Sequence, residues 1–542
     1  MLSILRKSAI FIIIILYYTN LFADIQEDKI KLMSKKYEDI MRIVVKNYVD
    51  SVDIEKITEE GFKAILKSLD NQSVYFDRDF YKSNKEVHTG KQIGLGMTIV
   101  KYKDTIAVQT VVFNSPSYLG GVKAGDRLYR VDTSKVINLS EFEINNLLNG
   151  DENTKITIEV FRKLKQVKKE NTGIVNYNND SSYYINNGFE LQKISLTRKS
   201  FAQSSISACY QKNEYGYIKL GRFTNVSDRD IIDTLKKFNH KKMKYLIIDV
   251  RGNGGGYLDQ VVNICGLFLD SGQYVIKSKA TNPNYNVTKS IKKRGEYYGL
   301  PLKILVDKES ASGSEILAGV VQDYDMGEVY GERTFGKGTV QNTWEFKDGT
   351  GFKITVAEYL TPLERPINKN PKNNTAQLDN SMKLFMNDDN FAELQKSIEE
   401  IGYGKLPIFK SSKGKVLIGG GGIFPNHFIK SDTTNILTQA LISKRIIFDF
   451  VHSLINYNSE IFSKIKSVED FENNFQLTDE MLLDFKKISY NYNTWNQNMY
   501  DQDKDIIKAV VKSRIVEVLF GTHYYYRIYN LSDKVYLEAI KN

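Results

Sequence analysis

The sequence predicts a multidomain protein with a layered α/β core, a small β-rich domain before it, and helical regions at both ends. The chain has 542 residues, which is too long for one ordinary domain, and 42% of them are hydrophobic. Along the chain, the spacing of apolar residues changes from a helical repeat to strict alternation. It then changes to continuous apolar strands separated by helices.

The first residues have the features of an export signal. Arg6 and Lys7 precede a short apolar run, and Leu21-Phe22-Ala23 ends in a small residue that suits cleavage. We therefore expect residues 1–23 to be a signal peptide. The protein would then work outside the cytoplasm, in the periplasm, associated with the inner membrane or secreted. The alternative is an uncleaved membrane anchor, for which the apolar run is short.

Residues 24–88 are expected to form a helical N-terminal region, because apolar residues recur at helical spacing there. Residues 89–163 are expected to form a small β-rich domain, in which short alternating segments are separated by glycine-rich corners. Residues 164–199 are expected to be a linker or insertion, since residues 166–187 are rich in Asn, Ser and Lys. The alternating segments are Met97–Val100, Ile106–Val111, Arg127–Val131 and Ile156–Val160.

Residues 200–428 alternate buried strands with helices, which predicts an α/β core. Tyr245–Val250 is a continuous apolar strand, as a sheet covered on both faces requires. Residues 429–542 are expected to be mostly helical. The clearest further elements are the helix Leu258–Leu269, the strand Leu302–Val306, the helix Glu315–Tyr324, the strand Glu328–Gly331 and the C-terminal helices Leu441–Ile455 and Ile506–Leu519.

Composition narrows the classes of function. The net charge is +10, from 75 Lys and Arg against 65 Asp and Glu, and it is spread along the chain without a nucleic-acid-binding signature. The five histidines show no H-x-E or H-E-x-x-H arrangement, so we expect neither a metal nor another cofactor. Cys209 and Cys265 cannot build a disulfide framework. Whether they pair is open, and two buried free thiols are the favoured interpretation.

The first candidate motif is Ser310-Ala311-Ser312-Gly313-Ser314-Glu315, at a predicted junction between a strand and a helix. Small residues at such a junction expose a hydroxyl, and the amides of the helix N-terminus favour developing negative charge. The structural alternative is that Ser312 or Ser314 is simply a helix N-cap.

The second motif, Gly331–Gly338, matches the G-x-x-x-x-G-K pattern of a phosphate-binding loop. We reject that interpretation because Gly338 occupies the position of the magnesium-binding hydroxyl. The residues that follow also alternate like a strand, so no helix N-terminus faces a phosphate. The simplest alternative is a surface lysine in a turn.

The third motif, Asp249–Gly256, ends the apolar strand with consecutive glycines. Such glycines let another backbone approach closely and present free N–H groups. The alternative is an ordinary turn from strand to helix.

Together these motifs resemble the C-terminal processing (tail-specific) serine peptidases, a PDZ-containing family, in its longer bacterial branch. The family pattern S-A-S-A-S-E is matched at Ser310–Glu315, F-G-K-G at Phe335–Gly338 and V-Q at Val340-Gln341, with 25 residues from Ser312 to Lys337. Asp249–Gly256 resembles the family's glycine-rich strand end. Gly94–Met97 and Ser115–Asp126 resemble its PDZ domain, so the resemblance covers nearly all of the chain after residue 23.

The resemblance implies a crotonase/Clp-protease-like α/β core with an inserted PDZ domain. It implies Ser312 as nucleophile, Lys337 as general base, and Gln341 as the amide that positions Lys337. A lysine can act as a base only when it is neutral. The oxyanion hole would use the N–H of Gly313 and the N–H of Gly255 or Gly256. Asp323 would be a supporting residue, or merely the polar end of a helix.

The resemblance also implies the function and the partners. The protein would be an exported serine endopeptidase that cleaves proteins recognised by free, apolar C-terminal tails, for processing or degradation. The substrate carboxylate would bind at Gly94, Leu95, Gly96 and Met97. An adaptor protein or a homo-oligomer could contribute. The alternative is a catalytically inert PDZ-based scaffold, against which the intact Ser312, Lys337 and Gln341 argue.

Three positions depart from the family pattern. Gly313 replaces the usual Ala after the nucleophile, which we expect to loosen the turn while keeping the amide. Asn426 stands where this branch usually has Asp. Residues 166–187 are expected to be an insertion.

Overall fold

A computed structural model describes most of the chain, which falls into two units. One unit combines residues 1–81 with 341–355, and the other combines 82–340 with 356–542. The signal-peptide prediction and the 166–187 insertion lie outside the described residues. No helix within the described ranges is long and apolar enough to cross a membrane. These ranges are 27–78, 91–102, 105–112, 115–163, 189–202, 204–369, 407–432, 434–491 and 494–541.

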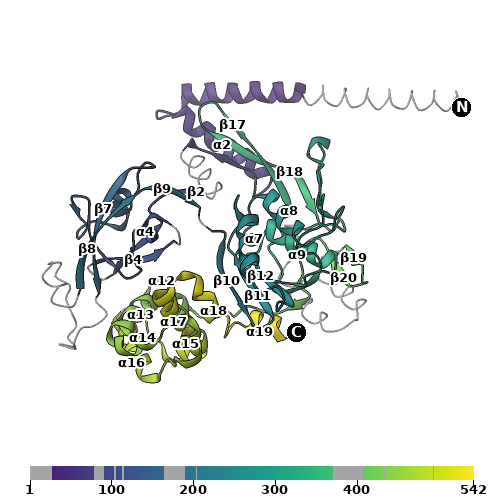
Figure 1. The fold of residues 1–542 in the computed structure, drawn as a ribbon. Helices are drawn as coiled ribbons and strands as arrows, with labels where there is room; N and C mark the ends of the chain where they lie inside the picture. Colours follow the sequence, from purple (N-terminus) through teal and green to yellow (C-terminus); the bar gives the residue numbers. More distant parts are fainter. Residues whose placement is uncertain are drawn as a thin grey trace. The chain divides into compact units, whose positions relative to one another are not determined.

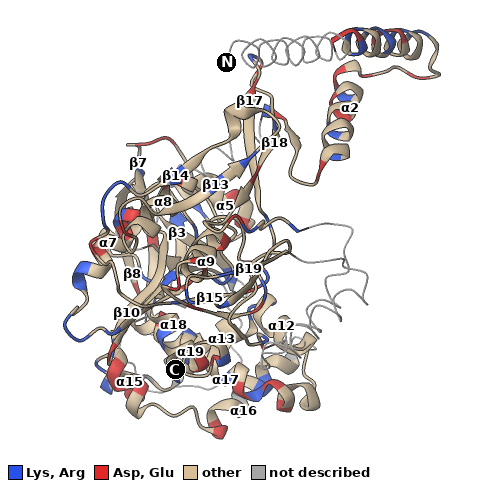
Figure 2. Ribbon diagram, turned by 90° about the vertical axis from the view of Figure 1, so that its right-hand side faces the viewer, with Lys and Arg blue, Asp and Glu red and all other residues tan. Residues whose placement is uncertain are grey.

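The first unit contains helices and a short antiparallel sheet. Residues 27–47 are helical, and acidic and basic side chains both occur along them (Figure 2). α2 (Ile54–Leu69) begins at Asp53, whose carboxylate accepts the N–H of Lys56. After α2, β1 (Val74–Phe76) pairs antiparallel with β18 (Gly351–Leu360), which also pairs with β17 (Thr339–Glu345). The predicted helical region thus ends in a strand.

The small β domain has the strand order β3-β4-β5-β7-β8, and β6 (Ser134–Lys135) pairs with β5. The four alternating segments of the sequence prediction are confirmed by the first four of these strands. Its core contains Val108, Ile144 and Ile158. The bounds are β2 (Lys91–Gly94), β3 (Met97–Tyr102), β4 (Thr105–Val111), α4 (Pro116–Leu119), β5 (Arg127–Val131), α5 (Glu141–Leu148), β7 (Lys155–Lys163), β8 (Phe189–Thr197) and β9 (Lys199–Ala202).

One element of this domain differs from the prediction. Residues 189–197, placed in the linker from sequence, form β8 and pair with β7 along nine residues, from Lys155 opposite Thr197 to Lys163 opposite Phe189. The strand was missed because it directly follows the long polar segment 166–187, whose composition dominated the interpretation.

The α/β core is a sheet of order β10-β11-β12-β15-β16-β21. Its first three strands, β10, β11 and β12, are labelled in Figure 1. β10 runs antiparallel to β11, and the remaining neighbours are parallel. Right after the parallel strands come the turns that carry the candidate site. The bounds are β10 (Ile206–Lys212), β11 (Tyr215–Leu220), β12 (Tyr245–Asp249), β15 (Leu302–Val306), β16 (Gly327–Gly331) and β21 (His427–Phe428).

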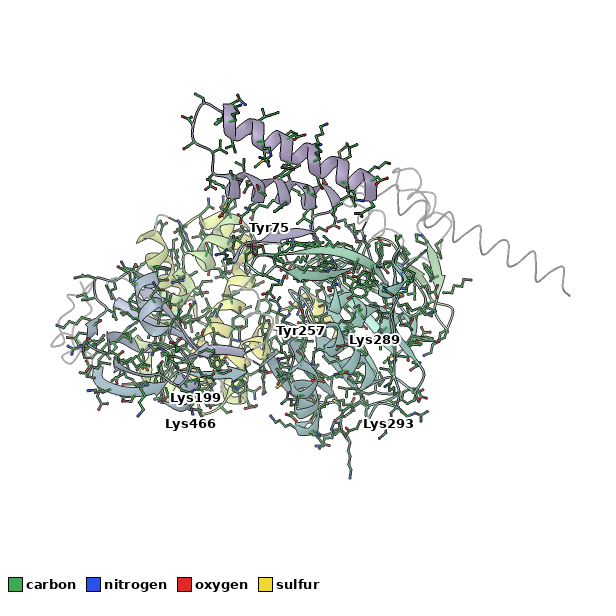
Figure 3. All side chains as sticks on the ribbon, turned by 90° about the horizontal axis from the view of Figure 1, so that it is seen from above. Tyr75, Lys199, Tyr257, Lys289, Lys293 and Lys466 are labelled. Atoms are coloured by element: carbon green, nitrogen blue, oxygen red, sulfur yellow. The ribbon has the colours of Figure 1, made fainter. Side chains whose placement is uncertain are left out.

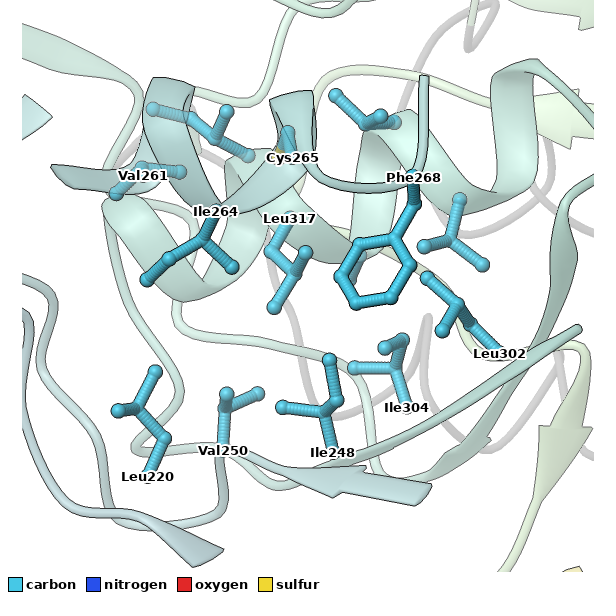
Figure 4. Close-up of a cluster of buried hydrophobic side chains, with 14 of the residues drawn as sticks. Leu220, Ile248, Val250, Val261, Ile264, Cys265, Phe268, Leu302, Ile304 and Leu317 are labelled. Atoms are coloured by element: carbon cyan, nitrogen blue, oxygen red, sulfur yellow. The ribbon is translucent and has the colours of Figure 1, made fainter. Parts of the chain in front are cut away.

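Both faces of this sheet are covered, as the continuous apolar strand predicted. On one face, α8 (Leu258–Gly266) places Ile264 and Phe268, the latter just beyond its end, against Ile248 and Ile304 (Figure 4). α7 (Ser227–Lys237) and α9 (Gly313–Asp323) complete this layer. Cys265 is buried here, which raises the pKa of its thiol to about 12, and both cysteines are free.

The opposite face is rich in tyrosine and is covered by the end of the chain. Tyr217, Ile247 and Leu305 on the sheet pack with Tyr536 and Ala539 of α19 (Lys534–Lys541). α18 (Tyr525–Tyr529) lies against the same sheet through β10. The C-terminal residues are therefore part of the α/β core rather than an appendage.

Smaller strands and one short helix flank the core. β13 pairs with both β14 and β18. β19 pairs with β20. The bounds are β13 (Tyr274–Lys279), η1 (Pro283–Tyr285), β14 (Thr288–Ser290), β19 (Ile408–Lys410) and β20 (Val416–Ile418).

The C-terminal helices have their own core, which includes Phe450, Phe485 and Val511. The predicted helix Leu441–Ile455 is two helices, because Arg445 adopts a left-handed conformation with φ 61° between them. The bounds are α12 (Ile436–Ser443), α13 (Ile446–Tyr457), α14 (Ser459–Lys464), α15 (Val468–Asn474), α16 (Asp479–Asn491), α17 (Gln497–Phe520) and η2 (Thr522–Tyr524).

Candidate active site

Ser312 lies on a strained turn between β15 and α9. Its backbone has φ 54° and ψ −109°, a combination that non-glycine residues rarely adopt and that occurs at sharp turns carrying nucleophiles. Ser312 is partly exposed, whereas Ser310, Ala311 and all residues of α9 are buried. It also occupies the N-cap position, where its carbonyl accepts the N–H groups of Glu315 and Ile316 at 2.9 and 3.0 Å.

The two neighbouring serines have structural roles. The Ser310 hydroxyl donates to the carbonyl of Val250 at 2.9 Å, and the Ser314 hydroxyl donates to the carbonyl of Asn253 at 2.8 Å. Both hydroxyls therefore tie the turn around Ser312, called the serine turn below, to the end of β12. The glycine-rich part of Asp249–Gly256, called the glycine turn, follows there. This leaves Ser312 as the candidate nucleophile of the three.

The glycine turn after β12 is held in place by Asn253. Its Nδ2 donates to the carbonyl of Leu220 at 2.9 Å, and its carbonyl accepts the N–H of Ala311 at 3.0 Å. Gly255 has φ +97°, and a Cβ on it would lie 2.7 Å from the Cβ of Ser312. Only glycine therefore permits this close approach to the candidate nucleophile.

The structure separates the two glycines predicted for the oxyanion hole. The N–H of Gly255 donates to Oδ1 of Asn253 at 2.9 Å. Gly256 has φ +152° and packs against the carbonyl of Phe223. Its neighbour Tyr257, labelled in Figure 3, has an exposed side chain. The N–H groups of Gly256 and Gly313 are the donors that remain for an oxyanion. Their role stays a prediction.

The loop that carries Lys337 is locked to the serine turn. The N–H of Phe335 donates to the carbonyl of Ser310 at 3.0 Å, and the N–H of Lys369 donates to the carbonyl of Gly336 at 3.0 Å. Lys337 itself is half-buried. β17 follows this loop, so no helix begins there, and the rejection of a phosphate-binding loop is confirmed.

Glu315 joins the two motifs and was not predicted as a site residue. Its Oε2 accepts the N–H groups of Ser312 and Lys337 at 2.8 and 2.9 Å. Its Oε1 accepts the Thr334 hydroxyl at 2.6 Å and the N–H of Gly336 at 2.7 Å. Burial raises the pKa of this carboxyl, and the four donated hydrogen bonds oppose that effect. The spacing S-x-x-E at Ser312 and Glu315 is the sequence signal that could have found it.

Asp323 is a buried ion-pair partner at the far end of α9. Its carboxylate binds Arg365, with Nε to Oδ1 at 2.8 Å, and accepts the N–H of Leu363 at 2.9 Å. Burial lowers the pKa of Arg365, and the Asp323 charge opposes that effect. Asp323 ends α9, whereas Ser312 precedes its first residue. Asp323 therefore acts on the site indirectly: it holds Arg365, and four residues later Lys369 donates its N–H to the carbonyl of Gly336 in the loop that carries Lys337. This geometry favours a supporting role over a bare helix end.

The remaining predicted residues are placed as follows. Gln341 lies on β17, in the N-terminal unit of the chain, and its role toward Lys337 stays a prediction. Asn426 accepts the N–H of Val329 at 2.9 Å and an amide N–H of Gln322 at 3.0 Å through Oδ1. An aspartate at this position also offers an oxygen to both donors, which explains why Asn is tolerated.

Gly313 leaves no empty space at the turn, and its expected loosening of the turn stays a prediction. A Cβ at this position would lie 2.7 Å from Cγ2 of Val261 and 3.2 Å from Cδ2 of Phe223. The space of the usual alanine methyl is therefore filled by these two side chains.

A buried charge network connects the glycine turn to the end of the chain. Arg251 binds Asp249 and also binds Asp533 with both oxygens, at 2.9 and 2.8 Å. Asp249 is fully buried and also accepts Lys219 at 3.0 Å. Burial alone would raise the pKa of Asp249, but the charges of Arg251 and Lys219 outweigh it and hold the pKa below its usual value.

The loop predicted to bind substrate tails lies between β2 and β3. Gly96 has φ +73°, and a Cβ on it would lie 2.1 Å from the Cβ of Ser115, so this turn requires glycine. Its carbonyl accepts the N–H of Val112 at 2.8 Å. β3 begins at Met97 and is the end strand of its sheet among the described residues, so an extended peptide has an edge to pair with.

Family comparisons agree with this layout. Residues 214–375 match peptidase family S41, and residues 93–170 match the PDZ domain. The chain thus contains a peptidase S41 region and a PDZ region, the combination found in C-terminal processing peptidases. Residues 437–521 also match a family of unknown function, which covers most of the C-terminal helices.

Two bacterial proteases are similar to this chain over the same region. The probable CtpA-like serine protease of Staphylococcus aureus (strain N315) is 28% identical over 328 residues, which are 60% of this chain and 61% of the relative. The carboxy-terminal processing protease CtpA of Bacillus subtilis (strain 168) is 27% identical over 336 residues, 62% and 66% of the two chains. The chain thus matches about three fifths of the length of its first relatives.

Solved structures give weaker likenesses. The photosystem II D1 C-terminal processing protease has 22% identity and a TM-score of 0.33, over 61% of this chain and 89% of its own. A putative S41 protease from Bacteroides fragilis has 14% identity and a TM-score of 0.35, over 56% and 79%. At these scores the overlays add nothing to the family assignment.

Proposed function

We propose that this protein is a serine endopeptidase with Ser312 as nucleophile and Lys337 as general base. The single observation that carries the proposal is that one buried carboxylate, Glu315, binds the backbone N–H groups of both residues. Two motifs far apart in the chain are thereby fixed in one site, next to a glycine turn that contacts Ser312. The three motifs that resemble those of serine peptidases and the match of residues 214–375 to peptidase family S41 support the same activity.

In this mechanism the neutral Lys337 amine takes the proton of the Ser312 hydroxyl as its oxygen attacks the scissile carbonyl. The resulting oxyanion accepts the N–H groups of Gly313 and Gly256, and losing one such donor typically costs about 3 kcal/mol of transition-state stabilisation. The Lys337 ammonium then gives its proton to the leaving amine. A water molecule, deprotonated by the same lysine, hydrolyses the acyl-enzyme.

The substrates in this proposal are proteins with free, apolar C-terminal tails. The tail would add as a strand to the open edge of β3, with its carboxylate at the amides of the Gly94–Met97 turn. The export signal predicted at residues 1–23 supports a location in the periplasm or at the outer face of the membrane.

The test is cleavage of an unfolded reporter protein with an apolar tail by purified wild type, Ser312→Ala and Lys337→Ala. We expect both variants to lose activity while keeping the wild-type unfolding temperature. Ser314→Ala is the matched control and should keep measurable activity, because within the described part of the chain its hydroxyl donates to the Asn253 carbonyl. Wild-type turnover by either dyad variant would overturn the assignment, and an inactive wild type would favour the scaffold alternative.

A further inference from the structure

Glu315 has an unusual set of contacts for a carboxylate at a helix start. A glutamate three residues after an N-cap normally reaches back to the N-cap N–H alone. Here the same side chain also accepts three donors from the lysine loop, and it is fully buried. A buried carboxylate is costly unless it is fully hydrogen-bonded, so these contacts account for its presence.

The contacts fit the ionised form of Glu315. Three of its four partners are backbone N–H groups, which can only donate. The fourth, the Thr334 hydroxyl, accepts the N–H of Ile423 at 2.6 Å and so directs its own proton to Glu315. A neutral amide of the same shape would place an NH₂ group against two of these donors.

We propose that Glu315 is a positioning residue that makes the Ser312 turn and the Lys337 loop one rigid unit. This proposal rests on the peptidase function proposed above. The positive φ of Ser312 costs free energy and persists only when its surroundings enforce it. Glu315 enforces it through the Ser312 N–H and fixes the base loop with the same oxygen.

The Glu315 carboxylate and its four donors, from Ser312, Thr334, Gly336 and Lys337, are called the clamp below. The clamp predicts a specific pattern in kinetics. Glu315→Gln should lower kcat on an unfolded substrate by about a hundredfold, because two charged hydrogen bonds are mispaired. KM should stay within about twofold, since neither the clamp nor its partners belong to the Gly94–Met97 turn. The matched control is Glu309→Gln, an exposed glutamate on the same turn, which should leave kcat and KM unchanged.

Amide hydrogen exchange tests the clamp independently of activity. In Glu315→Gln, peptides that contain Ser312 and Lys337 should exchange at least about tenfold faster, while peptides from β12 keep wild-type rates. Unchanged exchange at both residues would overturn the proposal even if activity fell. If the wild type proved inactive, the proposed function would fail while the exchange measurement still judged the clamp.

A second pair of variants covers the case in which Glu315→Gln does not fold. Thr334→Val removes one of the four donors and should lower kcat about tenfold, whereas Thr334→Ser keeps the hydroxyl and should restore the wild-type value. Equal kcat for the two variants would contradict the clamp. A rise in KM with unchanged kcat would do the same, because it would place the effect in substrate binding.

Discussion

Ser312 and Lys337 donate their backbone N–H groups to the same carboxylate oxygen, at 2.8 and 2.9 Å. The 24 residues between them carry the chain through α9 and β16 before it returns to the same point. The fixed spacing of the two motifs therefore has a physical cause. It is the length of one helix, one strand and their turns, closed by a shared acceptor.

The first prediction concerns Gly313. Gly313→Ala alone should destabilise the fold by about 1–3 kcal/mol, because the added methyl overlaps Val261, a stiff β-branched side chain. The double variant Gly313→Ala, Val261→Ala should recover part of this loss and restore the packing next to Ser312. Urea unfolding measures both changes, and additive destabilisation in the double variant would contradict the packing argument.

The second prediction concerns the buried pair of Asp323 and Arg365. Asp323→Asn leaves the Arg365 charge buried without its counter-ion and should cost about 3–5 kcal/mol of unfolding free energy. The apolar double variant Asp323→Leu, Arg365→Met should be much less destabilised. Both unfolding free energies come from denaturant titration, and equal losses in the two variants would mean that the lost charge is not the cause.

Sequence reasoning located the candidate motifs but not the contacts that hold them together. Ser312, Lys337 and the glycine turn stand out because small residues and a lysine at fixed spacing match a known pattern. Glu315 lies inside the same motif, yet its role depends on three donors from a loop about twenty residues further on, and local patterns do not show such contacts.

Other features were out of reach for the same reason. The bond between Arg251 and Asp533 joins residues 282 positions apart, so no window of sequence contains both. The break between α12 and α13 depends on a left-handed Arg445, a conformation that arginine rarely adopts and that composition does not signal. The alternating strands, by contrast, were predicted because apolar and polar residues alternate at consecutive positions of the sequence.

The third prediction concerns acid stability through His452. Burial lowers the pKa of this histidine to about 3, and the neighbouring Arg127 charge acts in the same direction. The unfolded chain binds a proton near pH 6.5 and the folded one does not, so stability falls as the pH drops from about 6.5 toward 3. At pH 4 we expect this one residue to lower the free energy of unfolding by about 3 kcal/mol relative to neutral pH.

The measurement is urea unfolding of wild type and His452→Leu at pH 7.5 and pH 4. The two proteins should differ little at pH 7.5, because the ring Nε2 of His452 makes no hydrogen bond within the described part of the chain. At pH 4 the leucine variant should be the more stable. Parallel pH dependence of the two proteins would show that His452 is protonated in the folded state.

The fourth prediction concerns recognition of the substrate tail. A free carboxylate at the Gly94–Met97 turn would accept charged hydrogen bonds worth roughly 1.5–3 kcal/mol. Amidating the last residue of one unfolded substrate should therefore slow its cleavage about tenfold or more. Replacing a final Val by Asp should slow it similarly, because the side chain next to the carboxylate is expected to enter an apolar pocket. The comparison uses cleavage rates of the free-acid, amidated and Asp-ended substrates by the same enzyme.

The matched variant is Gly96→Ala, which strains a turn with φ +73° and drives a methyl into Ser115. This variant should cleave the free-acid and amidated substrates at the same low rate, because the site that distinguishes them is lost. Equal rates for all three substrates with the wild type would mean that the small β domain does not select the tail. Ser312 and Lys337 would keep their proposed roles in that case, so the experiment tests recognition separately from catalysis.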